Sequence, residues 1–165
     1  MRESSVKNAL LRLTLLLALA LPGPATVAAP SESESAPTAR APEDADYAAG
    51  KQAIAAGNWQ VAADAFSRVV ARDAGNANAH NFLGYAYRKS GQLDLAFKHY
   101  EEALRRDSRH RGAHEYIGET YLLTNNLAKA EEHLKALDRI CTLGCEEYDD
   151  LKKAVAEYKR NNANK

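Results

Sequence analysis

The sequence predicts an all-α fold: a right-handed α-solenoid of three helix–turn–helix repeats, followed by a C-terminal capping helix. Three observations support this prediction. Small residues recur with a period of 34 residues in two rows: Gly50, Gly84, Gly118, and Ala62, Ala96, Ala130. Within a repeat, apolar residues recur every three or four positions, which is the spacing of one face of a helix. Finally, every proline lies at or before Pro42, so the rest of the chain lacks the residue that most disrupts helices.

The first 28 residues are predicted to be an export signal. Basic residues Arg2, Lys7 and Arg12 lead into an apolar run from Leu13 to Leu21, and small residues follow. This run is too short to span a bilayer, which takes about 20 residues. We expect cleavage after Ala28 and hence a periplasmic or otherwise exported protein; the alternative is an uncleaved amphipathic anchor.

Residues 29–42 are predicted to be a disordered linker. Each of them is small, charged or proline, so the segment cannot bury enough apolar surface to offset the entropy lost on ordering. The repeats follow at 43–76, 77–110 and 111–144, and each is expected to form two antiparallel helices.

The middle repeat shows why these residues form a helix pair. The apolar face of its first helix consists of His80, Leu83 and Tyr87. Because Gly84 and Ala96 are small, the two helices of the repeat can approach closely. Gly91 lies where the first helix must end in a left-handed turn, a conformation that glycine adopts at little cost. The equivalent turn residues of the flanking repeats are Gly57 and Asn125.

These three units resemble tetratricopeptide repeats. The middle unit matches the family pattern through His80, Leu83-Gly84, Tyr87, Ala96, Tyr100 and Ala103. All three units lack the proline that the family usually carries near the end of a repeat; the residues there are Ala74, Ser108 and Thr142. The resemblance covers residues 43–144, and it implies an array whose first helices line a concave groove that binds a protein or peptide.

A capping helix is predicted for residues 145–161, followed by a disordered tail at 162–165. The apolar face of this helix consists of Tyr148, Leu151, Val155 and Tyr158. Acidic residues cluster near its start, and Lys159 and Arg160 lie near its end, which is the order that a helix dipole favours. Such a helix covers the apolar face that a terminal repeat would otherwise expose.

The predicted partner-binding groove lies on the polar face of the first helices. Its residues are Tyr47, Lys51, Asn78, Asn81, Tyr85, Arg88, Glu115 and Glu119. Aromatic, amide and charged side chains together suit binding to a peptide, and Tyr85 and Arg88 are expected to serve binding rather than helix packing. The alternative is an ordinary polar helix face. The Lys and Asn positions of the family's carboxylate clamp are not reproduced, so a chain-terminal carboxylate is not the expected ligand.

The only cysteines, Cys141 and Cys145, lie between the last repeat and the capping helix. In an exported protein a disulfide is the leading interpretation. The alternatives are two free thiols, or a thiol-redox or copper(I) site. The last of these would make the chain a metal-binding or redox accessory protein rather than an interaction module.

No catalytic, metal or cofactor site is predicted. The sequence contains no phosphate-binding glycine loop, His-Glu-x-x-His motif or nucleophile elbow. Histidines recur one repeat apart, as His80 and His114 and as His99 and His133, which indicates repeated structural positions. The fifth histidine, His110, is interpreted as a solvated turn residue.

The charge balance bears on the class of partner. The chain has 22 Lys and Arg residues and 22 Asp and Glu residues. A neutral chain has no electrostatic reason to bind nucleic acid or an anionic membrane. We therefore expect a protein or peptide partner, no nucleic acid, no small-molecule substrate, and membrane contact only through a partner. Together these observations predict a non-catalytic protein–protein interaction scaffold of the cell envelope.

Overall fold

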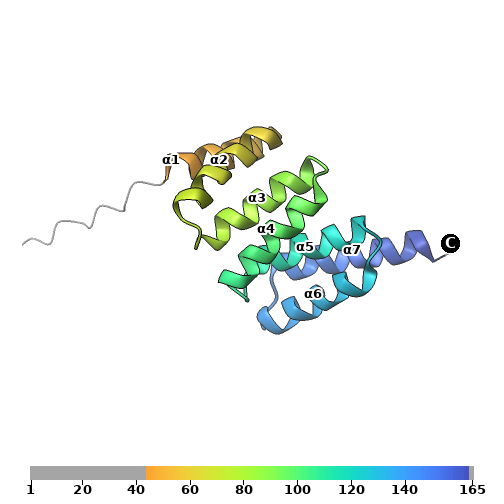
Figure 1. The fold of residues 1–165 in the computed structure, drawn as a ribbon. Helices are drawn as coiled ribbons and strands as arrows, with labels where there is room; N and C mark the ends of the chain where they lie inside the picture. The colour runs from red at the N-terminus through yellow and green to blue at the C-terminus, as the bar shows by residue number, and fades with distance from the viewer. Residues whose placement is uncertain (1–43, 164–165) are drawn as a thin grey trace, which may run out of the picture. The chain divides into compact units, whose positions relative to one another are not determined.

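The structure, a computed structural model, describes residues 44–163, and within this range it contains seven α-helices and no β-strand (Figure 1). The helices are α1 (Ala45–Ala55), α2 (Trp59–Arg72), α3 (Ala77–Lys89), α4 (Leu93–Arg106), α5 (Arg111–Leu123), α6 (Leu127–Ile140) and α7 (Glu146–Asn162). The predicted signal peptide (1–28), the predicted linker (29–42) and the last two residues of the predicted tail lie outside the described residues. Each predicted repeat holds two helices, and α7 follows them.

Side chains at the helix starts explain where α3 and α5 begin. The side-chain oxygen of Asn76 accepts a hydrogen bond from the N–H of Ala79 at 2.9 Å, which caps α3. One repeat later His110 has this role for α5, because its ring Nδ1 accepts a hydrogen bond from the N–H of Ala113 at 3.1 Å. The interpretation of His110 as a solvated turn residue is therefore wrong: its ring is half-buried and caps a helix.

The turn inside each repeat contains a residue in the left-handed conformation, as predicted. The φ angle is +71° at Gly57, +80° at Gly91 and +58° at Asn125. Just after Gly91, the N–H of Gln92 donates a hydrogen bond to the carbonyl of Tyr87, which closes the end of α3. These turns reverse the chain, so the two helices of a repeat lie side by side (Figure 1).

At Gly84, α3 and α4 are in close contact. A Cβ atom added at Gly84 would lie 2.8 Å from the ring of Tyr100 and 3.2 Å from the carbonyl oxygen of Ala96. Ala96 and Tyr100 are themselves fully buried. A larger residue at either small position would therefore push the two helices apart.

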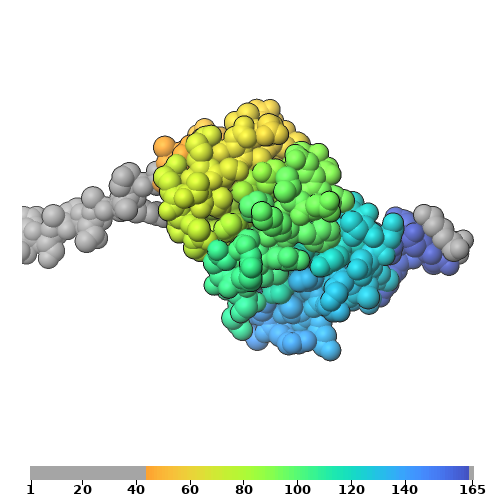
Figure 2. Space-filling view, viewed as in Figure 1, coloured from red at the N-terminus to blue at the C-terminus, as the bar shows by residue number. Residues whose placement is uncertain are grey.

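Within residues 44–163, buried apolar residues form three clusters that follow one another along the array. The first joins α1, α2 and α3 around Phe66, the second joins α4 and α5 around Tyr100, and the third joins α5, α6 and α7 around Leu137. Figure 2 shows the same order, with each pair of helices in its own band of colour against the next. Because each pair packs mainly on its neighbours, burial of apolar surface continues from one repeat to the next.

α7 takes the place that the first helix of a fourth repeat would have. It packs on α5 and α6, and its Leu151 and Val155 are buried. A Cβ atom added at Gly118 of α5 would lie only 2.6 Å from Leu151. Lys152 lies one repeat after Gly118 and is exposed, since no further described helix packs there. α7 spans 146–162, one residue later at each end than the predicted 145–161.

None of the helices within residues 44–163 combines the length and the apolar character that a membrane span requires.

Candidate functional site

Six of the eight predicted groove residues lie on the facing surfaces of α3 and α5. They are Asn78, Asn81, Tyr85 and Arg88 on α3, and Glu115 and Glu119 on α5. The other two lie on α1. Lys51 is exposed, whereas the ring of Tyr47 packs edge-on against Phe66 and Phe82, with ring centres 5.4 and 5.9 Å away. Tyr47 therefore contributes to the contact of α1 with α2 and α3.

Arg88 links α3 to α5. Its Nη1 lies 2.8 Å from Oε2 of Glu119. Its guanidinium carbon lies 5.3 Å from the ring centre of Tyr85 and 5.5 Å from that of Tyr116, within the range of cation–π attraction. Only 14% of the Arg88 side chain is exposed. The prediction that Tyr85 and Arg88 lie outside the packing contacts is therefore wrong, because this cluster holds neighbouring repeats together. Their role in partner binding stays a prediction.

An open cavity of about 310 Å³ adjoins this cluster, between the N-terminal halves of α3, α5 and α7. Its walls are Asn78, Asn81 and Phe82, then His110, Gly112, Glu115 and Tyr116, then Glu146, Glu147 and Asp150. The structure thus brings Asn78, Asn81 and Glu115 together, as the groove prediction requires. We name this space the groove cavity.

The carboxylates of α7 were missing from the predicted groove. The apolar spacing of α7 predicted only a covering role, and the predicted groove did not include its polar face. The repeat period held the missing signal, because Glu146 lies one repeat after Gly112 and therefore on the equivalent face of its helix.

Asn81 is a buried amide in the wall of the groove cavity. The residue is 4% exposed, and its Oδ1 has no hydrogen-bond partner among the described residues. Gly112 leaves room for this amide, since an added Cβ atom there would lie 3.2 Å from Nδ2 of Asn81. A buried polar atom without a partner costs about 1–3 kcal/mol. A ligand that donates a hydrogen bond to Oδ1 would remove this cost.

Asn78, at the mouth of the cavity, is already engaged. Its Oδ1 accepts a hydrogen bond from Nε2 of His110 at 3.0 Å. Since Nδ1 of His110 accepts the N–H of Ala113, Nε2 carries the ring proton. Burial lowers the pKa of His110, which keeps the ring neutral in this role.

Glu115 is the most deeply buried carboxyl of the cavity, with 8% of the residue exposed. Burial raises the pKa of Glu115 to about 8. The negative charges of Glu119, Asp150 and Glu147 contribute to this rise in the pKa, and the charge of Arg88 opposes it. No ion pair to Glu115 occurs in the described part of the chain. The cavity therefore presents a carboxyl that lacks a cationic partner.

Two histidine pairs lie outside the groove, one in each of the last two repeats. Nδ1 of His80 lies 3.2 Å from Nδ1 of His99, and Nδ1 of His114 lies 2.9 Å from Nδ1 of His133. Nε2 of His80 donates to the carbonyl of Ala74, so its Nδ1 is free to accept the N–H of His99. These pairs are contacts between the helices of a repeat. Residues 44–163 contain no group of three or more His, Cys, Asp or Glu side chains placed to hold a metal ion.

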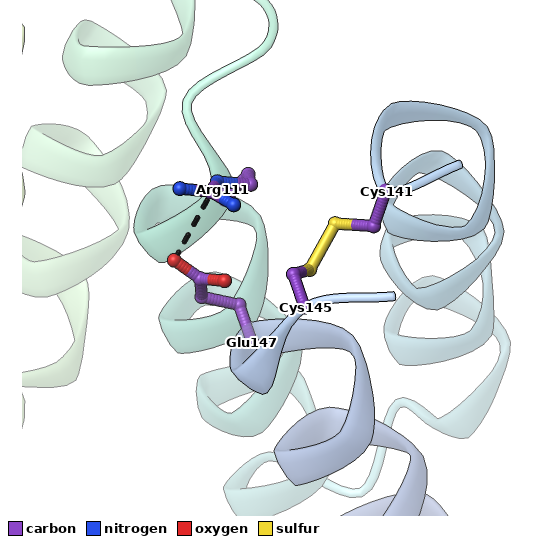
Figure 3. Close-up of a disulfide and its surroundings, with 4 residues drawn as sticks. All are labelled: Arg111, Cys141, Cys145 and Glu147. Atoms are coloured by element: carbon purple, nitrogen blue, oxygen red, sulfur yellow. Dashed lines mark ion pairs between the residues drawn. A yellow bond between two sulfur atoms is a disulfide. The ribbon is translucent and has the colours of Figure 1, made fainter. Parts of the chain in front are cut away.

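Cys141 and Cys145 are joined as a disulfide, which links the end of α6 to the start of α7 (Figure 3). Beside it, Arg111 at the start of α5 pairs with Glu147 of α7, with 3.6 Å between Nε and Oε1 (Figure 3). Both contacts hold the first turn of α7, and this turn carries carboxylates of the groove cavity.

A larger hollow of about 510 Å³ lies between α4, α5 and α6. Its wall carries charges of both signs, among them Lys98 and Glu101. Its carboxylate Glu102 already pairs with Arg105 and Arg106. The groove cavity, with its unpaired buried groups, is therefore the better candidate for a binding site.

Comparison with known proteins gives one family. A family model described as Tetratricopeptide repeat matches residues 47–108 and 87–142. No curated protein matches the chain.

Solved structures with the same fold include several proteins of low sequence identity. The translocator chaperone SycD of Yersinia enterocolitica is 19% identical with a TM-score of 0.65, over 72% of this chain and 83% of that one. The TPR2B domain of yeast Sti1, solved in complex with pHsp70, is 17% identical with a TM-score of 0.65, over 70% and 94%. PcrH, solved with the chaperone-binding region of PopD, is 20% identical with a TM-score of 0.62, over 72% and 90%.

Proposed function

This chain belongs to the tetratricopeptide repeat family, and we propose on that basis that it is a non-catalytic interaction module that binds a peptide segment of a partner protein in the groove of α3, α5 and α7. The single observation that carries the proposal is Asn81. Asn81 lines an open cavity, and its buried Oδ1 has no hydrogen-bond donor among the described residues. A peptide N–H could supply this donor after a small rotation of the amide.

Similar folds support a peptide as the kind of ligand. The Sti1 domain was solved in complex with pHsp70, and PcrH was solved with the chaperone-binding region of PopD. For this chain, the exposed Lys51 and the half-buried Tyr85 would extend the contact surface away from Asn81.

We also propose that the protein works outside the cytoplasm, in the periplasm or an equivalent exported location. The basic start, the apolar run and the small residues before Ala29 support this. So does the pair Cys141–Cys145, since disulfides persist in oxidising compartments. Mass spectrometry of the protein from the envelope fraction should give a chain that begins near Ala29 with an oxidised cysteine pair. Full-length protein with two free thiols in the cytoplasm would contradict export.

Selection of peptides from a random display library on the immobilised full chain tests the binding function. The enriched peptides are then titrated against the wild type, the groove variant Asn81→Leu, and the control Glu101→Lys on the exposed face of α4. Leucine has the same branched side-chain shape as asparagine and lacks the amide, and a thermal melt checks that the variant is folded. We expect Asn81→Leu to weaken binding about tenfold or more, as for a lost buried hydrogen bond, and Glu101→Lys to have no effect. Equal affinity for all three proteins would place binding elsewhere.

A further inference from the structure

We propose that the groove cavity binds the positively charged side chain of a lysine or arginine in the partner peptide. This inference rests on the proposed function, because it specifies the chemistry of the segment that the groove binds. The carboxylates that line the cavity are Glu115, Glu146, Glu147 and Asp150. Of these, Glu147 has a cationic partner in Arg111. The other three form no ion pair with any residue in the range 44–163.

Helix dipoles account for only part of this cluster. Glu146 and Glu147 lie in the first turn of α7, where the N-terminal end of the dipole stabilises negative charge. Asp150 and Glu115 lie beyond the first turn of their helices, where this effect has largely decayed. Glu115 is also more than nine-tenths buried, and buried carboxylates in proteins are normally paired. A cation in the cavity would be the missing partner.

Asn81 gives an independent reason to expect a ligand that donates hydrogen bonds. It lies across the cavity on α3, is 4% exposed, and its Oδ1 has no donor. Ammonium and guanidinium groups are donors only, so one such group can satisfy the amide oxygen and the carboxylates together. An anionic ligand would be repelled by the carboxylates and would leave the amide oxygen without a hydrogen-bond donor. A metal ion is not favoured, because no set of three ligating side chains in the described residues is placed to hold one.

The cavity has a proton-linked signature that can be measured. In the free protein the pKa of Glu115 is raised to about 8, first by burial and then by Glu119, Asp150 and Glu147, against Arg88. A cation beside the carboxyl favours its ionised form. Binding should therefore release a proton, and affinity should rise as the pH increases from about 6 to about 8.

The other titratable and charged groups around Glu115 are Arg88, Glu119, Glu147 and Asp150, with His110 and Tyr116. Burial lowers the pKa of His110 and so disfavours its charged form. Burial raises the pKa of Tyr116 to about 12, so its hydroxyl stays neutral as well. Lysine and arginine of the peptide are charged throughout this pH range. The pH dependence is thus expected to come from Glu115.

The test compares three full-length proteins in the display selection. The first is the wild type and the second is the double variant Glu115→Gln/Asp150→Asn, which keeps the side-chain shapes and removes both ionisable groups. The third is the matched control Asp94→Asn/Glu101→Gln, whose two sites are exposed on α4. Thermal melts confirm that all three are folded.

We expect the wild type and the control to enrich peptides with lysine or arginine at one fixed position. The double variant should bind these peptides roughly tenfold or more weakly, as for a lost charge-assisted hydrogen bond. Norleucine at the fixed position should weaken binding to the wild type by a similar factor. The rise in affinity with pH should be absent in the double variant.

Two results would overturn the inference, and they are distinguishable. The first result is a set of peptides that depend on Asn81 but carry no fixed basic residue, or that bind the double variant as tightly as the wild type. It would refute the binding of a basic side chain and leave the proposed function standing. A selection that enriches no peptide at all would refute both.

Discussion

His80 and His99 show at the residue scale what a repeat period can and cannot reveal. The period correctly indicated that these histidines have structural positions, because His114 and His133 repeat them. It did not reveal that the histidine rings of each repeat contact one another, with the same separation of 19 residues in both repeats. Likewise the period gave no sign that Arg88 pairs with Glu119. Such contacts depend on the side-chain conformations and helix spacing of the folded chain, which the spacing of residues does not encode.

The histidine pairs predict how stability depends on pH. Burial, together with the facing histidine, lowers the pKa of His99 and of His133 to about 4. In the unfolded chain the pKa of a histidine is about 6.5. Between these values the unfolded state binds protons that the folded state does not. The contribution to stability is therefore complete above about pH 6.5 and is lost as the pH falls towards 4.

Chemical denaturation across this range measures the effect. We expect the free energy of unfolding of the variant His99→Gln/His133→Gln to fall less steeply with decreasing pH than that of the wild type. Glutamine is uncharged throughout, and its amide N–H can still donate to the partner histidine. Parallel pH profiles for the two proteins would show that the pairs do not resist protonation.

α7 is the element that links the fold to the proposed site. Its apolar face covers α5 and α6 through Leu151 and Val155, as the predicted capping role requires. Its first turn also carries carboxylates into the groove cavity. The sequence therefore predicted the packing of this helix from its apolar spacing, while its polar face required the three-dimensional register of α7 beside α5. The Cys141–Cys145 bond fixes that register at one end.

The variant Cys141→Ser tests this role of the disulfide. Loop-closure entropy for so short a loop gives a loss of stability of up to about 2 kcal/mol. A freer start of α7 would also weaken the binding of selected peptides, because Glu146 and Glu147 lie directly after Cys145. Thermal melts with and without reductant measure the effect. Reductant should lower the stability of the wild type to that of the variant and leave the stability of the variant unchanged. A wild type that does not respond to reductant would contradict this account.

At the scale of the described array, the sequence predicted the helices, their turns and their order. Small residues such as Gly84 and Ala96 specify close helix contacts that recur in every repeat. The 34-residue period alone was therefore enough to predict the helix pairs. The groove was predicted only in part. Asn78, Asn81 and Glu115 share one cavity, whereas Tyr47 and Arg88 are engaged in packing. Whether a polar helix face stays open depends on the side chains of neighbouring repeats, and this is a property of the whole array.

The binding of a selected peptide, mapped by amide chemical shifts, tests the central claim most directly. The ¹⁵N-labelled full chain is titrated with the peptide, and shifts are followed for every assigned amide. We predict saturable shifts in the N-terminal halves of α3, α5 and α7, including the side-chain amide of Asn81, with little change on the exposed faces of α2, α4 and α6. Shifts confined to α2, α4 and α6, with Asn81 unmoved, would contradict the account.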